Sequence, residues 1–220
     1  MLIVSRSDAK AVIDAAVLFI SAAADRLNAS KFSDTAISRF RGTIAGQLRS
    51  VSRRLVEIAW ADGNGQGETP YNIATDYFNE QAGFLGDFVI AISENRGNRK
   101  IPGGSFRAAM YGESLGQCYQ KAYFKARGSR VGLPDLPAYP RDGSTVCLTN
   151  CRCTWVIKRI SQSAFTATWK LGAAEHCPDC ITRGRVWNPI SIVRVLSVND
   201  AGDKELGDWQ MTDATGAAVN

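Results

Sequence analysis

Apolar and polar positions alternate with the period of an α-helix through the first 128 residues. Apolar side chains recur three and four positions apart in four stretches, which predicts helices over residues 8–28, 34–62, 70–92 and 105–127. The second stretch has the most regular stripe, preceded by Ser33 as an N-cap and followed by the Asp-Gly-Asn-Gly turn at 62–65. The pattern therefore predicts a helical region of about four helices over residues 1–128.

The pattern changes at Gly128. Residues 128–145 contain three prolines among turn residues, which is typical of an ordered linker. Beyond it, residues 153–158 and 165–171 alternate with period two, which predicts a hairpin that turns near residues 161–163 and pairs Trp155 with Trp169. Residues 192–198 are expected to add a strand. The sequence thus predicts an α+β fold with three parts: a helical docking region at 1–128, a small antiparallel β unit at 129–198 and an acidic flexible tail at 199–220.

Five of the six cysteines and the only histidine lie between residues 147 and 180. Two groups of thiols separated by one hairpin are typical of a structural zinc site, since Zn²⁺ takes four tetrahedral ligands and a Cys-x-x-Cys turn supplies two of them. We therefore predict a zinc ion that staples the β unit, with His176 as the alternative to one thiol. The candidate ligands are Cys147, Cys151, Cys153, Cys177 and Cys180.

Other interpretations of the same cysteines stay open. A disulfide with one further unligated cysteine fits the spacing, and so does plain burial. A catalytic zinc is disfavoured because such sites keep one position open for water and usually carry histidine or carboxylate ligands. Cys118 lies on the apolar face of the fourth predicted helix and is expected in the core. With one histidine and no paired carboxylates at a telling spacing, the sequence predicts no enzyme.

The net charge of +5 and the isoelectric point of about 9.0 fit a partner that carries negative charge. Such a partner is an acidic protein face or the DNA backbone, although a basic stretch is most often a solvated face. The apolar run at residues 10–24 is interrupted by Asp14 and too short to span a bilayer, so we expect a buried helix, a cytosolic product and no membrane contact. The predicted partner face comprises Arg49, Arg53, Arg54, Lys121 and Lys125.

Residues 136–153 read Leu-Pro-Ala-Tyr-Pro-Arg-Asp-Gly-Ser-Thr-Val-Cys-Leu-Thr-Asn-Cys-Arg-Cys. This run resembles the C-terminal part of the tailed-phage head morphogenesis proteins, the Mu-type minor head family. The Cys-Arg-Cys at 151–153, the Cys-Pro-Asp-Cys at 177–180 and Trp169 match elements of that family, and residues 107–114 resemble its helix leading into this region. The chain departs from the family in order, since its Cys-x-x-Cys follows the Cys-Arg-Cys, and Tyr139 stands where the family usually has histidine.

The resemblance implies a minor virion protein of the phage head or portal vertex, synthesised in the host cytoplasm. It implies a role in head assembly through contacts with portal or capsid proteins, in multiple copies of a symmetric assembly. The alternative is a nucleic-acid-binding module of the zinc-knuckle type that contacts packaged DNA.

Overall fold

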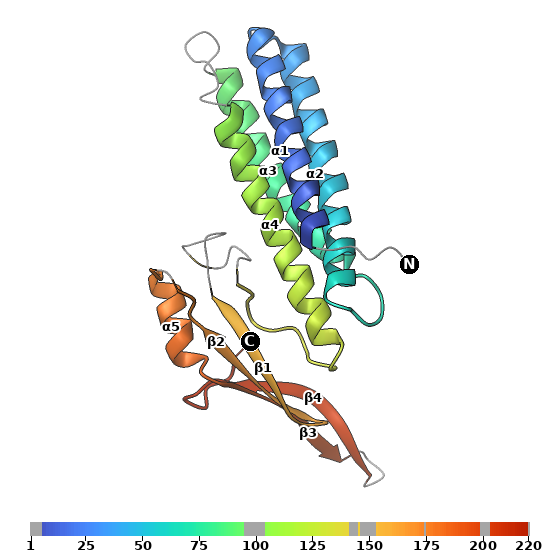
Figure 1. The fold of residues 1–220 in the computed structure, drawn as a ribbon, viewed down its shortest axis with the longest axis vertical. Helices are drawn as coiled ribbons and strands as arrows, with labels where there is room; N and C mark the ends of the chain where they lie inside the picture. Colours follow the sequence, from blue (N-terminus) through green and yellow to red (C-terminus); the bar gives the residue numbers. More distant parts are fainter. Residues whose placement is uncertain are drawn as a thin grey trace. The chain divides into compact units, whose positions relative to one another are not determined.

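The computed structural model of the 220-residue chain describes residues 6–94, 104–140, 145, 153–173, 175–198 and 203–219. The fold is α+β, as predicted: long helices come first and an antiparallel sheet follows (Figure 1). The elements in chain order are α1 (Arg6–Ala29), α2 (Asp34–Asp62), α3 (Tyr71–Glu94), α4 (Gly104–Ser129), β1 (Thr154–Ser161), β2 (Ala164–Lys170), α5 (Pro178–Val186), β3 (Ile190–Val198) and β4 (Lys204–Thr212).

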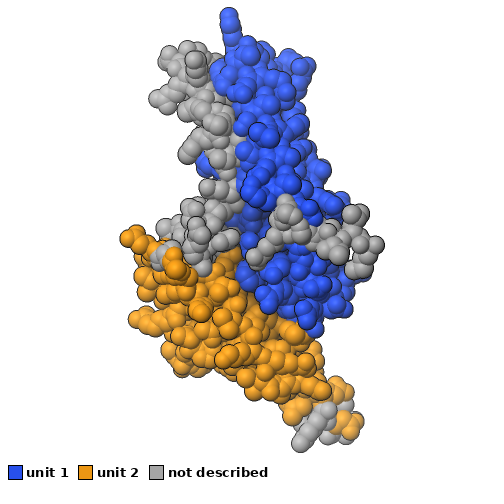
Figure 2. Space-filling model, in the orientation of Figure 1, with its two compact units in different colours: residues 1–130 blue, residues 131–220 orange. Residues whose placement is uncertain are grey.

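The chain forms two compact units, residues 1–130 and residues 131–220 (Figure 2). The change of character that the sequence predicts at Gly128 falls inside the last turn of α4. The first unit holds the four long helices, and the second holds the sheet and α5. Within the described ranges, none of the helices has both the length and the apolar character that a bilayer crossing needs.

The helix α2 is the centre of the first unit, because it packs against α1, α3 and α4. Its predicted boundaries are confirmed. The Ser33 hydroxyl accepts a hydrogen bond from the Ala36 amide at 3.3 Å, and Gly63 caps the C-terminal end. The side chains that α2 buries completely include Ile44, Leu48 and Leu55, each 0% exposed. Removing such side chains from water is the main stabilising contribution to a bundle of this kind.

Buried or half-buried polar contacts connect α4 to its neighbours. The hydroxyl groups of Tyr77 on α3 and Ser114 on α4 are 2.8 Å apart. The Cys118 thiol lies 3.8 Å from the Ser52 carbonyl oxygen, to which it donates. Burial raises the pKa of both Tyr77 and Cys118, and that of Cys118 reaches about 12. Cys118 is therefore a neutral core thiol, which confirms its predicted place.

The second unit contains one sheet with the strand order β1-β2-β3-β4, antiparallel throughout. The predicted hairpin is confirmed: β1 and β2 pair with Trp155 opposite Trp169. The indole rings of that pair meet edge to face at 5.1 Å between centroids. One face of the sheet is buried and includes Phe165, Ala167 and Ile192, all at 1% exposed or less. The hairpin is not isolated, because β3 continues the sheet beside β2.

Two parts of the second unit differ from the sequence prediction. The tail expected to be flexible contributes β4, which pairs with β3 from Ser191↔Thr212 to Val198↔Lys204. Its Trp209 contacts Phe165 at 5.5 Å between ring centroids, so one large aromatic side chain anchors an otherwise acidic segment. The segment after β2 folds into α5, a helix that the sequence pattern did not predict because its nine residues are too few for a clear helical stripe.

Candidate metal centre and basic surface

The predicted zinc ligands fall partly within the described structure. Cys147 and Cys151 lie outside the described residues. Cys153 is buried and immediately precedes β1. Cys177 is the N-cap of α5, and Cys180 lies in the first turn with 0% of its surface exposed. No disulfide joins any two of the described cysteines, Cys118 included.

The start of α5 follows from its sequence. Cys177 has the extended backbone of an N-cap residue, and Pro178 follows at the first helical position, where its fixed φ suits a helix and its missing N–H is not needed. Asp179 in the first turn and Arg183 in the last turn both complement the helix dipole. The Cys-x-x-Cys motif is thereby held on a helix N-terminus, a position whose free amides favour thiolates.

His176 lies close to Cys153, although Cys153 precedes the β1–β2 hairpin in the chain and His176 follows it. The Cys153 Sγ and His176 Nδ1 atoms are 3.9 Å apart. The other ring nitrogen, Nε2, lies 2.8 Å from the Gly172 carbonyl oxygen, so we assign the proton to Nε2, which donates to that oxygen. Nδ1 then presents its lone pair toward the thiol. A backbone carbonyl that holds the second ring nitrogen in this way is typical of histidine metal ligands.

The Cys153–His176 pair fits zinc chemistry. Tetrahedral zinc with Zn–S near 2.3 Å and Zn–N near 2.0–2.1 Å places the two donor atoms roughly 3.6 Å apart. The 3.9 Å between Cys153 Sγ and His176 Nδ1 exceeds this by a few tenths of an ångström. Among the described residues, however, no group of three or more His, Cys, Asp or Glu side chains could hold a metal ion. The five-cysteine ligand set therefore stays a prediction, and a four-ligand site built on Cys153 and His176 would need both Cys147 and Cys151.

An aromatic cluster of the second unit includes Trp155, which lies two residues after Cys153 at the start of β1. Trp155, Trp169 and Trp187 contact one another, with ring centroids 5.1–5.8 Å apart. The Trp155 indole N–H donates to the Ala138 carbonyl oxygen at 2.8 Å, which attaches the proline-rich linker to the sheet. The guanidinium of Arg183, on α5, lies 5.3 Å from the Trp169 ring centroid and 4.9 Å from that of Trp187.

The predicted basic partner face is partly engaged within the chain. The Arg49 guanidinium lies 4.4 Å from the Phe78 ring centroid and that of Arg53 lies 4.8 Å from the Tyr71 centroid, so both arginines of α2 stack on aromatic rings of α3. Arg54 forms an ion pair with Glu57 at 3.2 Å on the helix surface. Arg49 and Arg53 thus connect α2 to α3, and Arg54 neutralises the charge of Glu57.

The two remaining members of that face are on α4. Lys121 is exposed and Lys125 is half-buried. The aromatic residues interleaved with them are mainly structural: Tyr119 is 4% exposed and donates a hydrogen bond to Asp62 at 2.6 Å. Tyr119 also stacks on Tyr123 at 6.0 Å between centroids. A stacking platform for bases would need these rings to face solvent.

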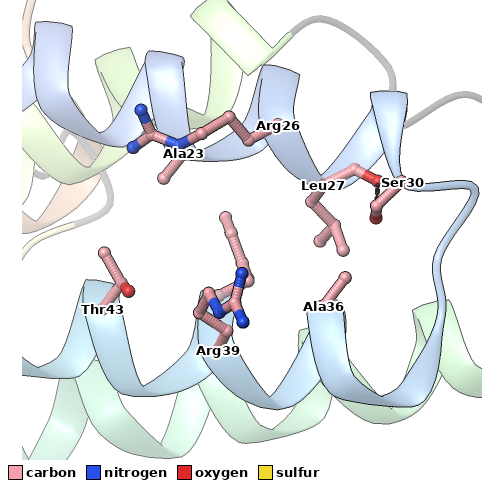
Figure 3. Close-up of a pocket in the computed structure, with 8 residues that line it drawn as sticks. Ala23, Arg26, Leu27, Ser30, Ala36, Arg39 and Thr43 are labelled. Atoms are coloured by element: carbon pink, nitrogen blue, oxygen red, sulfur yellow. Dashed lines mark hydrogen bonds between the residues drawn. The ribbon is translucent and has the colours of Figure 1, made fainter.

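A different basic site lies between α1 and α2. A pocket of about 130 Å³ opens there (Figure 3). Two arginines line it, Arg26 in the last turn of α1 and Arg39 in the first half of α2. Neither Arg26 nor Arg39 is among the five residues of the predicted partner face. Arg26 could have been found from its position three residues after Ala23 and four before Ser30, because this spacing places an arginine at the edge of the apolar stripe of α1. The lining residues are Ala23, Arg26, Leu27, Ser30, Ala36, Arg39, Phe40 and Thr43.

Comparison of the chain with protein-family models, with curated proteins and with solved structures found no match.

Proposed function

We propose that this chain is a structural protein of a tailed-phage virion, a minor head protein associated with the portal, which acts in head assembly through protein–protein contacts. In this proposal it is made in the host cytoplasm, is located at the head or portal vertex in multiple copies, and catalyses no reaction. A structural zinc, held by Cys153 and His176 together with thiols of the predicted set, would stabilise the β unit. The family resemblance of residues 136–153 supports this assignment.

The observation that carries the proposal is a two-stranded arm of the sheet, which extends past the end of β2. Strand β2 pairs with β3 only along Ile190–Val193, whereas β3 and β4 remain paired as far as Val198↔Lys204. Residues 195–198 and 204–208 therefore form a two-stranded arm past the end of β2, and Figure 1 shows β3 and β4 extending beyond β1 and β2. The pairing register of β3 and β4 shifts between Arg194 and Leu196, at the base of the arm.

The arm exposes apolar side chains. Leu196 and Leu206 are directly opposite each other and are 60% and 55% exposed. Two-stranded ribbons are marginal in water, and an apolar cross-strand pair contributes only about 0.2–1 kcal/mol on its own, so a surface that covers the pair would stabilise the ribbon further. Exposed large apolar side chains that lie together are typical of protein–protein contact sites. We therefore expect the arm to pack against a neighbouring subunit.

The test combines detection in particles with a variant of the arm. Mass spectrometry of phage particles purified from the host should find the chain among the virion proteins. A Leu196→Ser/Leu206→Ser variant should fold normally, with unchanged circular dichroism, and yet be incorporated at a strongly reduced level. Ile181→Ser is the matched control, because Ile181 is 54% exposed but lies on α5. Absence of the chain from particles, or normal incorporation of the arm variant, would overturn the proposal.

The alternative, a zinc-knuckle module that binds nucleic acid, is less favoured. The contacts that Arg49, Arg53 and Arg54 make inside the helical unit account for much of the predicted basic face. A salt titration of DNA binding separates the two functions, because affinity based on phosphate contacts falls steeply with salt. Steep salt dependence that disappears after replacement of Arg53 and Arg54 would favour the alternative.

A further inference from the structure

We propose that the pocket between α1 and α2 binds a carboxylate side chain and the adjoining apolar part of an acidic protein segment, presented by the partner in the assembly. This inference rests on the proposed function, because it names the chemistry by which the helical unit would recognise a structural partner. It differs from the arm in place and in mechanism.

The first observation is the charge at the pocket. Arg26 and Arg39 line it from two different helices, and Figure 3 shows Arg26 lying along α1 and Arg39 projecting from α2. Neither guanidinium makes a hydrogen bond or an ion pair with any residue in the described part of the chain, unlike Arg54 on the same helix. No acidic residue is among the eight that line the pocket. The site thus holds two positive charges whose counterion the described structure does not supply.

The second observation is the composition of the lining. Its apolar part is formed by Ala23, Leu27, Ala36 and Phe40, of which Leu27 and Phe40 belong to the buried core. Thr43 contributes a hydroxyl that donates to no residue in the described ranges. An apolar floor beside two guanidinium groups suits a carboxylate on a short hydrocarbon stem, and planar guanidinium groups bind carboxylates through paired hydrogen bonds. A phosphodiester has no apolar stem to place against such a floor.

The third observation is the turn that joins α1 and α2, which follows the lining residue Ser30. The turn between α1 and α2 uses left-handed backbone at Lys31 and Phe32, with φ values of 53° and 59°. The Ser30 hydroxyl donates to the Leu27 carbonyl at 2.7 Å, and Phe32 packs against the core. These contacts define the backbone of the turn between the two helices that carry the arginines, and a site whose backbone is already ordered loses less entropy on binding.

The experiment is an NMR titration of the full-length chain with three small probes. 4-Methylpentanoate carries a carboxylate on an apolar stem, 4-methylpentanamide is its neutral analogue, and dimethyl phosphate represents the nucleic-acid backbone. We expect saturable shifts of amide signals in residues 23–30 and 36–43 with 4-methylpentanoate only, with Kd on the order of 10 mM for so small a ligand. Arg26→Ala or Arg39→Ala should abolish saturation. Arg41→Ala is the matched control, because Arg41 is exposed on α2 but does not line the pocket.

Each other outcome overturns the inference. Stronger shifts with dimethyl phosphate would assign the pocket to nucleic acid, and shifts with the neutral amide would show that charge is not recognised. The same holds if no probe binds, or if the alanine variants bind as the wild type does. Incorporation into particles is measured separately. If the chain is found in virions but its pocket binds no carboxylate, only the inference about the pocket is refuted. If the pocket binds the carboxylate but the chain is absent from virions, only the proposed function is refuted.

Discussion

Helix α4 packs closely against α1 at Gly112, and replacing this glycine provides a sharp test of the helix packing. A Cβ atom at Gly112 would lie 2.4 Å from Val17 Cγ2, whereas unstrained carbon atoms are about 3.5–4.0 Å apart. Gly116, one turn later on the same helix, is the matched control, because a Cβ there meets no described atom within 4 Å. The two Gly→Ala changes thus add the same methyl group with and without a clash.

The expected magnitudes follow from two opposing effects. In an open helix interior, alanine is more stable than glycine by about 1 kcal/mol, so Gly116→Ala should stabilise the helical unit by up to that amount. At Gly112 the same gain is opposed by overpacking, which costs about 1–3 kcal/mol in a well-packed core. Val17 cannot turn away easily, because a β-branched side chain has essentially one χ1 rotamer in a helix. Because the gain is common to both variants, we expect Gly112→Ala to be less stable than Gly116→Ala by roughly 1–3 kcal/mol, the cost of overpacking.

The measurement is urea unfolding of the full chain followed by circular dichroism at 222 nm, which reports mainly on the four long helices. Tryptophan fluorescence follows the second unit, which holds four of the five tryptophans. A double-mutant cycle completes the test. Val17→Ala removes Cγ2 and leaves Val17 Cβ, which lies 3.9 Å from the new methyl group, so the pair should show a favourable coupling energy. Equal stabilisation by both Gly→Ala changes, or zero coupling with Val17, would refute this account of the α1–α4 contact.

Three further predictions concern the core, the buried thiol and the metal. Leu48→Ala should lower the free energy of unfolding by about 2–5 kcal/mol in the same assay, whereas Leu18→Ala, at a residue 72% exposed, should change it by less than about 0.5 kcal/mol. The pKa of the Cys118 thiol is about 12 in the folded protein and about 8.5 in the unfolded chain, so on raising the pH the unfolded chain loses the proton first. The contribution of this thiol to the free energy of unfolding is therefore complete below pH 8.5 and declines toward pH 12, by up to about 1.4 kcal/mol per pH unit. Urea titrations at pH 8 and pH 10 measure this decline, and a wild-type slope identical to that of Cys118→Ala would contradict it. Protein purified without added zinc should contain about one zinc per chain by elemental analysis, and Cys153→Ser or His176→Ala should lower that content; a metal-free wild type with the same melting temperature would argue against the site.

Much of the fold could be predicted from residue patterns, for local reasons. The stripe of α2 and its Ser33 cap specify both the helix and its start, because the capping hydroxyl satisfies an amide only a few residues away. The Trp155–Trp169 pair followed from period two and a short turn, which together define the register. The strand β4 could not be predicted in this way, since its acidic sequence becomes a strand only beside β3, with Trp209 packed on Phe165.

The candidate sites divide along the same line. The clustering of cysteines and the choice of zinc are properties of residue type and spacing, so the sequence alone determined them as hypotheses. The orientation of His176 toward Cys153 depends on the Gly172 carbonyl, and the stacking of Arg49 on Phe78 depends on how α2 and α3 pack. The exposed leucine pair of the arm likewise exists only because β3 extends beyond the end of β2 in the sheet. The sequence by itself determines the helices, their caps, the hairpin and the chemistry of each residue, because these depend on near neighbours in the chain. Only the tertiary structure decides which charged side chains are engaged and which apolar side chains stay exposed, because those properties depend on contacts between residues far apart in the chain.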